Sequence, residues 1–198
     1  GRVSDEAGAA FWAGRIEDDL TTTQVARRFT ITAEYGGAVV DALTRAHLGR
    51  PATAAERAAD GPEVVAGARL DVLARLLGGD EFYDSTAPPF SGDPATDATW
   101  VQGLYQAALG RAAGAGEVAW IESRLAAGED RAEVAYGVLR SPEGRAHLVR
   151  TTYRELLRRN PGAGERSYWG DELGRGLSPE RMVMFVAGSP EYVASTTV

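Results

Sequence analysis

The chain of 198 residues contains no cysteine and no lysine, and only two histidines. Without cysteine, disulfides and thiolate-bound metals are excluded. No run of about 18 apolar residues occurs, so the sequence predicts no membrane-spanning helix. The net charge of −7 offers no basic footprint for a nucleic-acid backbone or an anionic membrane surface. We therefore expect neither nucleic acid nor membrane insertion among its interactions.

The composition is otherwise that of a folded protein. Hydrophobic residues make up 44% of the chain and charged residues 25%, and the length suits one large domain or two small ones. All 21 basic residues are arginine. Together with abundant alanine and glycine, this indicates GC-biased coding of the actinobacterial kind.

The most informative feature is an internal repeat. Ser141-Pro142-Glu143 recurs as Ser189-Pro190-Glu191, 48 positions later, and the same offset relates Leu125 to Leu173. A fixed period of this size is typical of stacked supersecondary units. We predict an all-α fold of tandem repeats of about 48 residues, each built from about three helices.

Four copies of the repeat can be traced. Copies three and four cover about residues 100–145 and 146–193, and copy two is degenerate. Copy one aligns with copy four at an offset of 157, which places Phe11-Trp12 on Tyr168-Trp169 and Arg2 on Arg159. We expect the chain to begin inside a repeat, after its first helix, and to end where another first helix begins.

Domain boundaries follow from a proline-rich stretch. Three prolines and a glycine between Thr86 and Pro94 cannot continue a helix. We predict a first lobe at residues 1–86, a linker at 87–99 and a second lobe at 100–198.

Capping residues predict where the helices begin. Ser141-Pro142 combines an N-cap serine with proline at the first helical position, and Ser178-Pro179 does the same. Thr21 followed by Gln24 forms a capping-box pattern at the position equivalent to Ser178, and Asp130 stands there in copy three.

The order of these motifs resembles a bacterial family, the domain of unknown function 4214. The resemblance is carried by Leu104-Tyr105, Leu109-Gly110-Arg111, Tyr168-Trp169 and Ser189-Pro190-Glu191-Tyr192. The family is similar to the helical linker domains of phycobilisomes, and it recurs in exported proteins such as surface-layer proteins and adhesins. The resemblance therefore implies an extracellular or cell-surface association module, with no established catalytic residue.

Two charged positions recur across the copies. One always carries arginine and the other always carries glutamate: Arg2, Arg50, Arg111 and Arg159, and Glu34, Glu81, Glu143 and Glu191. We expect each glutamate in the first turn of a helix, where the helix dipole favours it. The arginine then ties down a turn or pairs with a glutamate between helices. The alternative is a recurring ligand site built from the same residues.

Aromatic residues form the candidate ligand-binding set. Trp12, Trp120 and Trp169 fall in the second helix of their copies, where they belong to the core or present a flat face to a sugar. The candidate sugar platform is Tyr168-Trp169 with Asp171, echoed by Phe11-Trp12.

Metal and catalytic signals are weak. His47 and His147 occupy different repeat positions, and no nucleophile-elbow motif is present. Calcium stays open as a cofactor through Asp5 and Glu6, or through Asp93 and Asp97, although no EF-hand loop supports it.

The favoured function is a non-catalytic binding or adhesion module of a secreted or cell-surface protein, with a glycan or cell-envelope polymer as ligand. One alternative is a structural scaffold or oligomerisation module that contacts other proteins. A third is a polysaccharide hydrolase with two carboxylates.

Overall fold

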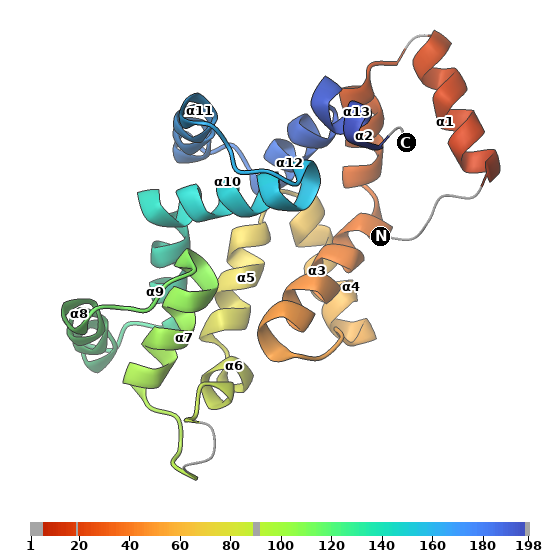
Figure 1. The fold of residues 1–198 in the computed structure, drawn as a ribbon. Coiled ribbons are helices and arrows are strands. Elements are labelled where there is room, and N and C mark those ends of the chain that lie inside the picture. Colours follow the sequence, from red (N-terminus) through yellow and green to blue (C-terminus); the bar gives the residue numbers. More distant parts are fainter. Residues whose placement is uncertain (1–5, 19, 89–91, 197–198) are drawn as a thin grey trace.

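The computed structural model describes residues 6–18, 20–88 and 92–196 (Figure 1). Within these ranges the protein is all-α, with thirteen helices and no strand, which confirms the predicted fold class. The helices are α1 (Glu6–Asp18), α2 (Thr22–Thr30), α3 (Ala33–Leu48), α4 (Ala54–Val65), α5 (Arg69–Gly78), α6 (Asp80–Ser85), α7 (Asp97–Leu109), α8 (Ala115–Ala126), α9 (Arg131–Arg140), α10 (Pro142–Leu157), α11 (Ala163–Gly174), α12 (Pro179–Ala187) and α13 (Pro190–Thr196). None of these helices is long and apolar enough to cross a membrane.

The helices begin where the capping residues predict. Thr21 forms a full capping box with Gln24 at the start of α2. The Ser141 hydroxyl accepts from the Gly144 amide and begins α10, and Ser178 begins α12 in the same way. At α9 the Asp130 carboxylate accepts from the Ala132 amide at 2.7 Å. A local side chain therefore satisfies one amide in the first turn of each of these four helices.

Left-handed residues end three long helices. α3 ends at Gly49 (φ 68°), α7 at Gly110 (φ 72°) and α10 at Arg158 (φ 56°). Glycine adopts this conformation without strain, whereas arginine carries a steric cost there. Each of these residues directly precedes or belongs to the loop that leads into the next helix, so the three chain turns have a common design.

Three clusters of buried side chains form the core. The largest joins α5 and α6 to α7, α8 and α9, and it holds Trp100, whose indole Nε1 donates to the carbonyl oxygen of Leu77 at 2.8 Å. A second cluster lies among α10, α11 and α12, and a third among α3, α4 and α5. The largest cluster thus contains residues from both sides of the proline-rich stretch. The division into two lobes and the repeat length stay predictions.

Two pairs of helices meet at a glycine. The end of α5 lies at the start of α9, where Arg131 donates from Nε to the carbonyl oxygen of Gly78 at 3.0 Å. The end of α12 meets the start of α2 in the same way, with the Thr22 hydroxyl donating to Gly188 at 2.5 Å. A Cβ on Gly78 or Gly188 would lie 2.4 or 2.5 Å from backbone atoms of the partner helix. Only glycine allows so close an approach.

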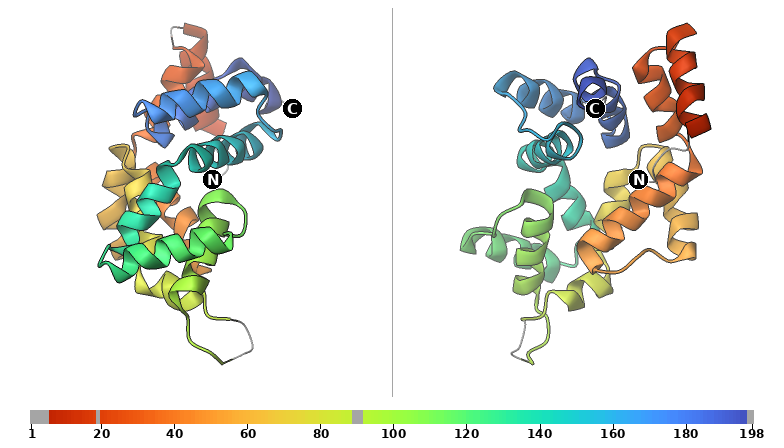
Figure 2. Two further views of the ribbon diagram at one scale, coloured as in Figure 1. Left: turned by 90° about the vertical axis from the view of Figure 1, so that its left-hand side faces the viewer. Right: turned by 45° about the vertical axis from the view of Figure 1, so that its right-hand side comes forward.

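The pairing of α2 with α12 brings an early and a late segment of the chain together. α2 packs against α12, and α1 projects at the edge of the molecule (Figures 1 and 2). α3 and α4 also approach each other closely, since a Cβ on Gly36 would lie 2.4 Å from the carbonyl oxygen of Gly61. The candidate functional site is built on these packed helices and the loops between them.

Candidate functional site

The recurring arginines and glutamates form a repeated ion-pair arrangement, here called the Arg–Glu clamp. Arg111 lies in the loop between α7 and α8 and donates from Nη1 and Nη2 to Glu117 of α8 at 2.8 and 2.7 Å. Its Nε and Nη2 donate to Glu143 at the start of α10 at 2.6 and 2.8 Å. One guanidinium therefore joins a loop to the starts of two helices, through bidentate geometry on both sides.

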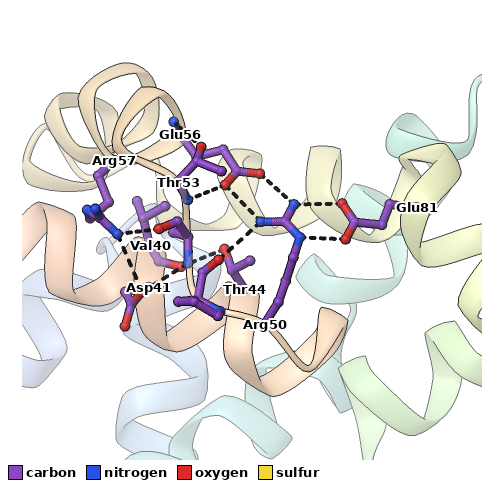
Figure 3. Close-up of polar contacts among 10 residues, drawn as sticks. Val40, Asp41, Thr44, Arg50, Thr53, Glu56, Arg57 and Glu81 are labelled. Atoms are coloured by element: carbon purple, nitrogen blue, oxygen red, sulfur yellow. Dashed lines mark hydrogen bonds and ion pairs between the residues drawn. The ribbon is translucent and has the colours of Figure 1, made fainter.

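The same clamp occurs twice more. Arg50 binds Glu56 of α4 and Glu81 of α6, as Figure 3 shows. Arg159 binds Glu165 of α11 and Glu191 of α13. In each clamp the glutamate of the following helix also accepts from the backbone amide of the N-cap residue, for example from Gly114 to Glu117 at 2.7 Å. The clamp is thus part of the helix cap as well as a bridge.

Electrostatics match this geometry. The hydrogen bonds from the arginine lower the pKa of Glu56, Glu117 and Glu165 to about 2. The same arginines lower the pKa of Glu81, Glu143 and Glu191. All six carboxylates are therefore ionised near neutral pH and paired with arginine, as expected of acids with a structural role.

One of the two glutamates in each clamp was not predicted from the sequence. Glu56, Glu117 and Glu165 were not among the expected paired residues, although each follows its arginine by six positions. That spacing, with a cap residue three positions ahead of the glutamate, was the available signal. In copy one, Glu34 lies in the first turn of α3 as expected. Arg2 lies outside the described residues.

The residues of the expected sugar platform differ in their exposure to solvent. Trp169 is only 8% exposed and packs in the cluster of α10, α11 and α12, where its Nε1 donates to the Tyr153 hydroxyl at 2.8 Å. Its ring is therefore not an open stacking face, which corrects that part of the expectation. Tyr168 is 58% exposed and meets Trp169 edge to face, and Asp171 is exposed beside them.

The other expected aromatics lie apart from this pair. Phe11 and Trp12 of α1 form a second edge-to-face pair, and Trp12 also contacts Phe29 of α2 with ring centroids 5.1 Å apart. Trp120 of α8 is exposed, with the Arg124 guanidinium over its ring at 4.6 Å. Exposed aromatic rings are thus distributed over separate faces of the molecule.

A cavity of about 300 Å³ lies between α3, α5, α7 and α10 and is lined by both histidines. Arg69, Thr151 and Glu155 add polar groups, and the remaining lining is mostly leucine and alanine. Burial lowers the pKa of His47 and of His147, so both imidazoles are neutral near pH 7. The sequence did not predict this meeting, because the two histidines occupy different repeat positions.

Metal ligation has little support in this arrangement. In the part of the chain that the structure describes, no group of three or more His, Asp or Glu side chains is placed to hold a metal ion. Arg150 donates from Nη2 to His147 Nδ1 at 2.7 Å, so that nitrogen is already engaged. Asp5, one of the residues considered for calcium, lies outside the described residues.

One acid is buried without a partner. Glu180, at the start of α12, is 5% exposed, and neither of its carboxylate oxygens has a hydrogen-bond partner in the described structure. Burial raises its pKa, while its own backbone amide, Arg69 and the Ser178 hydroxyl act more weakly in the opposite direction. A lone carboxyl in this position favours the protonated form.

Comparison with known proteins identifies one family. Residues 74–148 match the model of the family described as Domain of unknown function (DUF4214). The comparison with curated proteins gave no significant match, and neither did the comparison with solved structures. The matched residues run from α5 to α10 and contain the Arg111 clamp and much of the largest core cluster. Residues 74–148 are therefore a DUF4214 domain.

Proposed function

We propose that this chain is a non-catalytic association module that binds a protein partner through exposed helix faces. The observation that carries the proposal is an apolar surface on α1 and α2. Phe11 and Ile16 of α1, Phe29 of α2 and Ile31, which directly follows α2, are all exposed. Trp12 contacts the rings of both Phe11 and Phe29. Contiguous exposed apolar surface of this kind marks protein-contact sites.

Two further features support a scaffold. The three Arg–Glu clamps hold loops and helix starts in fixed positions, and all six of their glutamates form ion pairs with arginine. A rigid frame with an apolar contact face suits association better than turnover. The resemblance to modules of exported proteins favours a secreted or cell-surface location for this association.

Sedimentation velocity over a wide concentration range tests the proposal. Reversible association that weakens when Phe29 is replaced by serine is the expected result. A chain that stays monomeric at every concentration, and whose sedimentation is unchanged by Phe29→Ser, contradicts association through this surface. Trp120→Ala on α8 is a suitable control, because it removes an exposed aromatic ring from a different face.

Glycan binding is the second candidate function. Exposed Tyr168 and Trp120 favour it, since both present aromatic rings to solvent. A glycan array run with calcium and again with a chelator separates the two proposals. Selective binding that is lost in Tyr168→Ala supports a lectin-like module, and chelator sensitivity implicates the carboxylates. A blank array from folded protein, together with association in sedimentation, favours the scaffold.

A further inference from the structure

We propose that the surface formed by Trp12 and Ile16 of α1 with Val25 and Phe29 of α2, here called the open face, docks a partner helix with the chemistry of α10. That chemistry is an amphipathic helix carrying a tyrosine, with leucines three and four residues later. The inference rests on the proposed association function and specifies the partner.

The two copies share an aromatic arrangement. Phe11 and Trp12 meet with ring centroids 5.1 Å apart at 81°, and Tyr168 and Trp169 meet at 4.9 Å and 71°. In both copies the tryptophan also contacts a phenylalanine of the following helix, Phe29 in copy one and Phe185 in copy four. Phe185 aligns with Arg28 and not with Phe29, so the two helix pairs share an aromatic contact that comes from neighbouring repeat positions.

Burial separates the two copies at aligned positions. Ile16 is 42% exposed, whereas Leu173, which aligns with it at the offset of 157, is 7% exposed. Phe29 is 50% exposed, and its counterpart Val186 is 3% exposed. Val25 and Trp12 are likewise only partly covered, while Met182 and Trp169 are buried. Four positions that form core in copy four are thus exposed or only partly covered in copy one.

In copy four, α10 buries these positions. This helix packs on α11 and supplies Val149, Tyr153, Leu156 and Leu157 to the cluster that buries Trp169 and Leu173. Tyr153 also accepts the hydrogen bond from Trp169 Nε1 at 2.8 Å. On the open face, Trp12 and Ile16 lie four residues apart on one side of α1, as Trp169 and Leu173 do on α11. A helix of the α10 type therefore finds matching positions on α1.

The sequence ahead of α1 has the form of the loop that follows such a helix. Gly1-Arg2 aligns with Gly110-Arg111 and with Arg158-Arg159, which connect α7 to α8 and α10 to α11. The mode of recognition is an amphipathic helix in an apolar groove, with anchors at helical spacing.

A chain extended at its N-terminus tests the docking. The added segment has the sequence of residues 141–157 and is joined directly to Gly1, because Gly1 aligns with Arg158. Ile16→Ala is then made in the original and in the extended chain, and the folded-to-unfolded ratio is measured by urea titration. The substitution is expected to lower that ratio at least about tenfold more in the extended chain, where Ile16 is covered.

Phe11→Ala is the matched control. Phe11 lies on the same helix, and its counterpart Tyr168 stays 58% exposed although α10 is present. Its effect is expected to be equal in the two chains. Equal effects of Ile16→Ala in the original and extended chains would overturn the proposal, since the added helix would then not cover Ile16.

A peptide in trans covers the case in which the extended chain does not fold. A fluorescent peptide of residues 141–160 is titrated against the original protein and followed by anisotropy. Saturable binding that Ile16→Ala weakens about tenfold, and that Phe11→Ala leaves unchanged, supports the docking. Absence of saturable binding contradicts it.

Sedimentation separates this inference from the proposed function. If the original chain forms a dimer that Ile16→Ala abolishes and that an excess of the peptide of residues 141–160 leaves intact, the open face pairs with a second copy and the partner helix proposed here is wrong. If the chain associates and Ile16→Ala changes neither association nor the response to the added helix, the association function stands and this docking surface is wrong.

Discussion

Gly78→Ala tests whether the close approach of α5 and α9 is a main support of the fold. The added methyl group would lie 2.4 Å from the Ala132 amide nitrogen and 2.6 Å from its Cα. Both are backbone atoms, so no side chain can rotate away and the two helices must separate. Around this contact lie side chains that are almost fully buried, among them Leu77 and Val134.

The expected cost follows from two opposing effects. Overpacking a well-packed contact costs about 1–3 kcal/mol. Replacing glycine by alanine in a helix gains up to about 1 kcal/mol, although less at a helix end. We expect a net loss of about 2 kcal/mol, which lowers the melting temperature of a chain of this size by about 4–8 °C.

Gly137→Ala is the control in the partner helix. Gly137 is exposed in the interior of α9, and an added Cβ there meets no atom within 4 Å. This variant should gain about 0.5–1 kcal/mol, because alanine loses less backbone entropy than glycine. Thermal unfolding followed by far-UV circular dichroism measures both variants. A Gly78→Ala protein as stable as Gly137→Ala would refute the reasoning.

Three other predictions concern acids and aromatic residues. The pKa of Glu117 lies near 2 instead of its ordinary 4.5, so its stabilising effect is present above pH 4.5 and is lost as pH falls toward 2. The urea midpoint of the protein should fall over that pH window, and it should fall less in Glu117→Gln. Burial raises the pKa of Glu180, so the cost of ionising it in the folded protein grows as pH rises. Glu180→Gln should therefore raise the free energy of unfolding by about 1–3 kcal/mol at neutral pH but change it little in acid, as measured by the same urea titration. Trp169→Ala should cost about 3–5 kcal/mol in urea unfolding, whereas Tyr168→Ala should cost far less; similar losses would contradict the core position of Trp169.

Local features were open to prediction from sequence because they depend on neighbouring residues. The starts of α2, α10 and α12 follow from Thr21, Ser141 and Ser178, whose side chains accept from amides three residues ahead. The recurrence of arginine and glutamate likewise indicated paired charges between helices, and three such pairings are present.

The candidate site was predictable only in part. The aromatic pair at Tyr168-Trp169 carried two opposite interpretations, since a ring at helical spacing is as suitable for a core as for a surface. Its outcome depended on α10, which lies far enough away in sequence that no local pattern links Tyr153 to Trp169. The cavity shared by His47 and His147 had no signal at all, because 100 residues separate them.

The sequence by itself determined the helical class, the places where helices begin and end, and the repeated charged positions, since caps, turns and periodicity act over a few residues. Only the tertiary structure decided which faces are covered. Gly78 meets α9 and Gly188 meets α2 through contacts between distant segments, and the same repeat position is core at Leu173 and surface at Ile16. Burial is a property of what packs on a side chain, and that depends on the path of the whole chain.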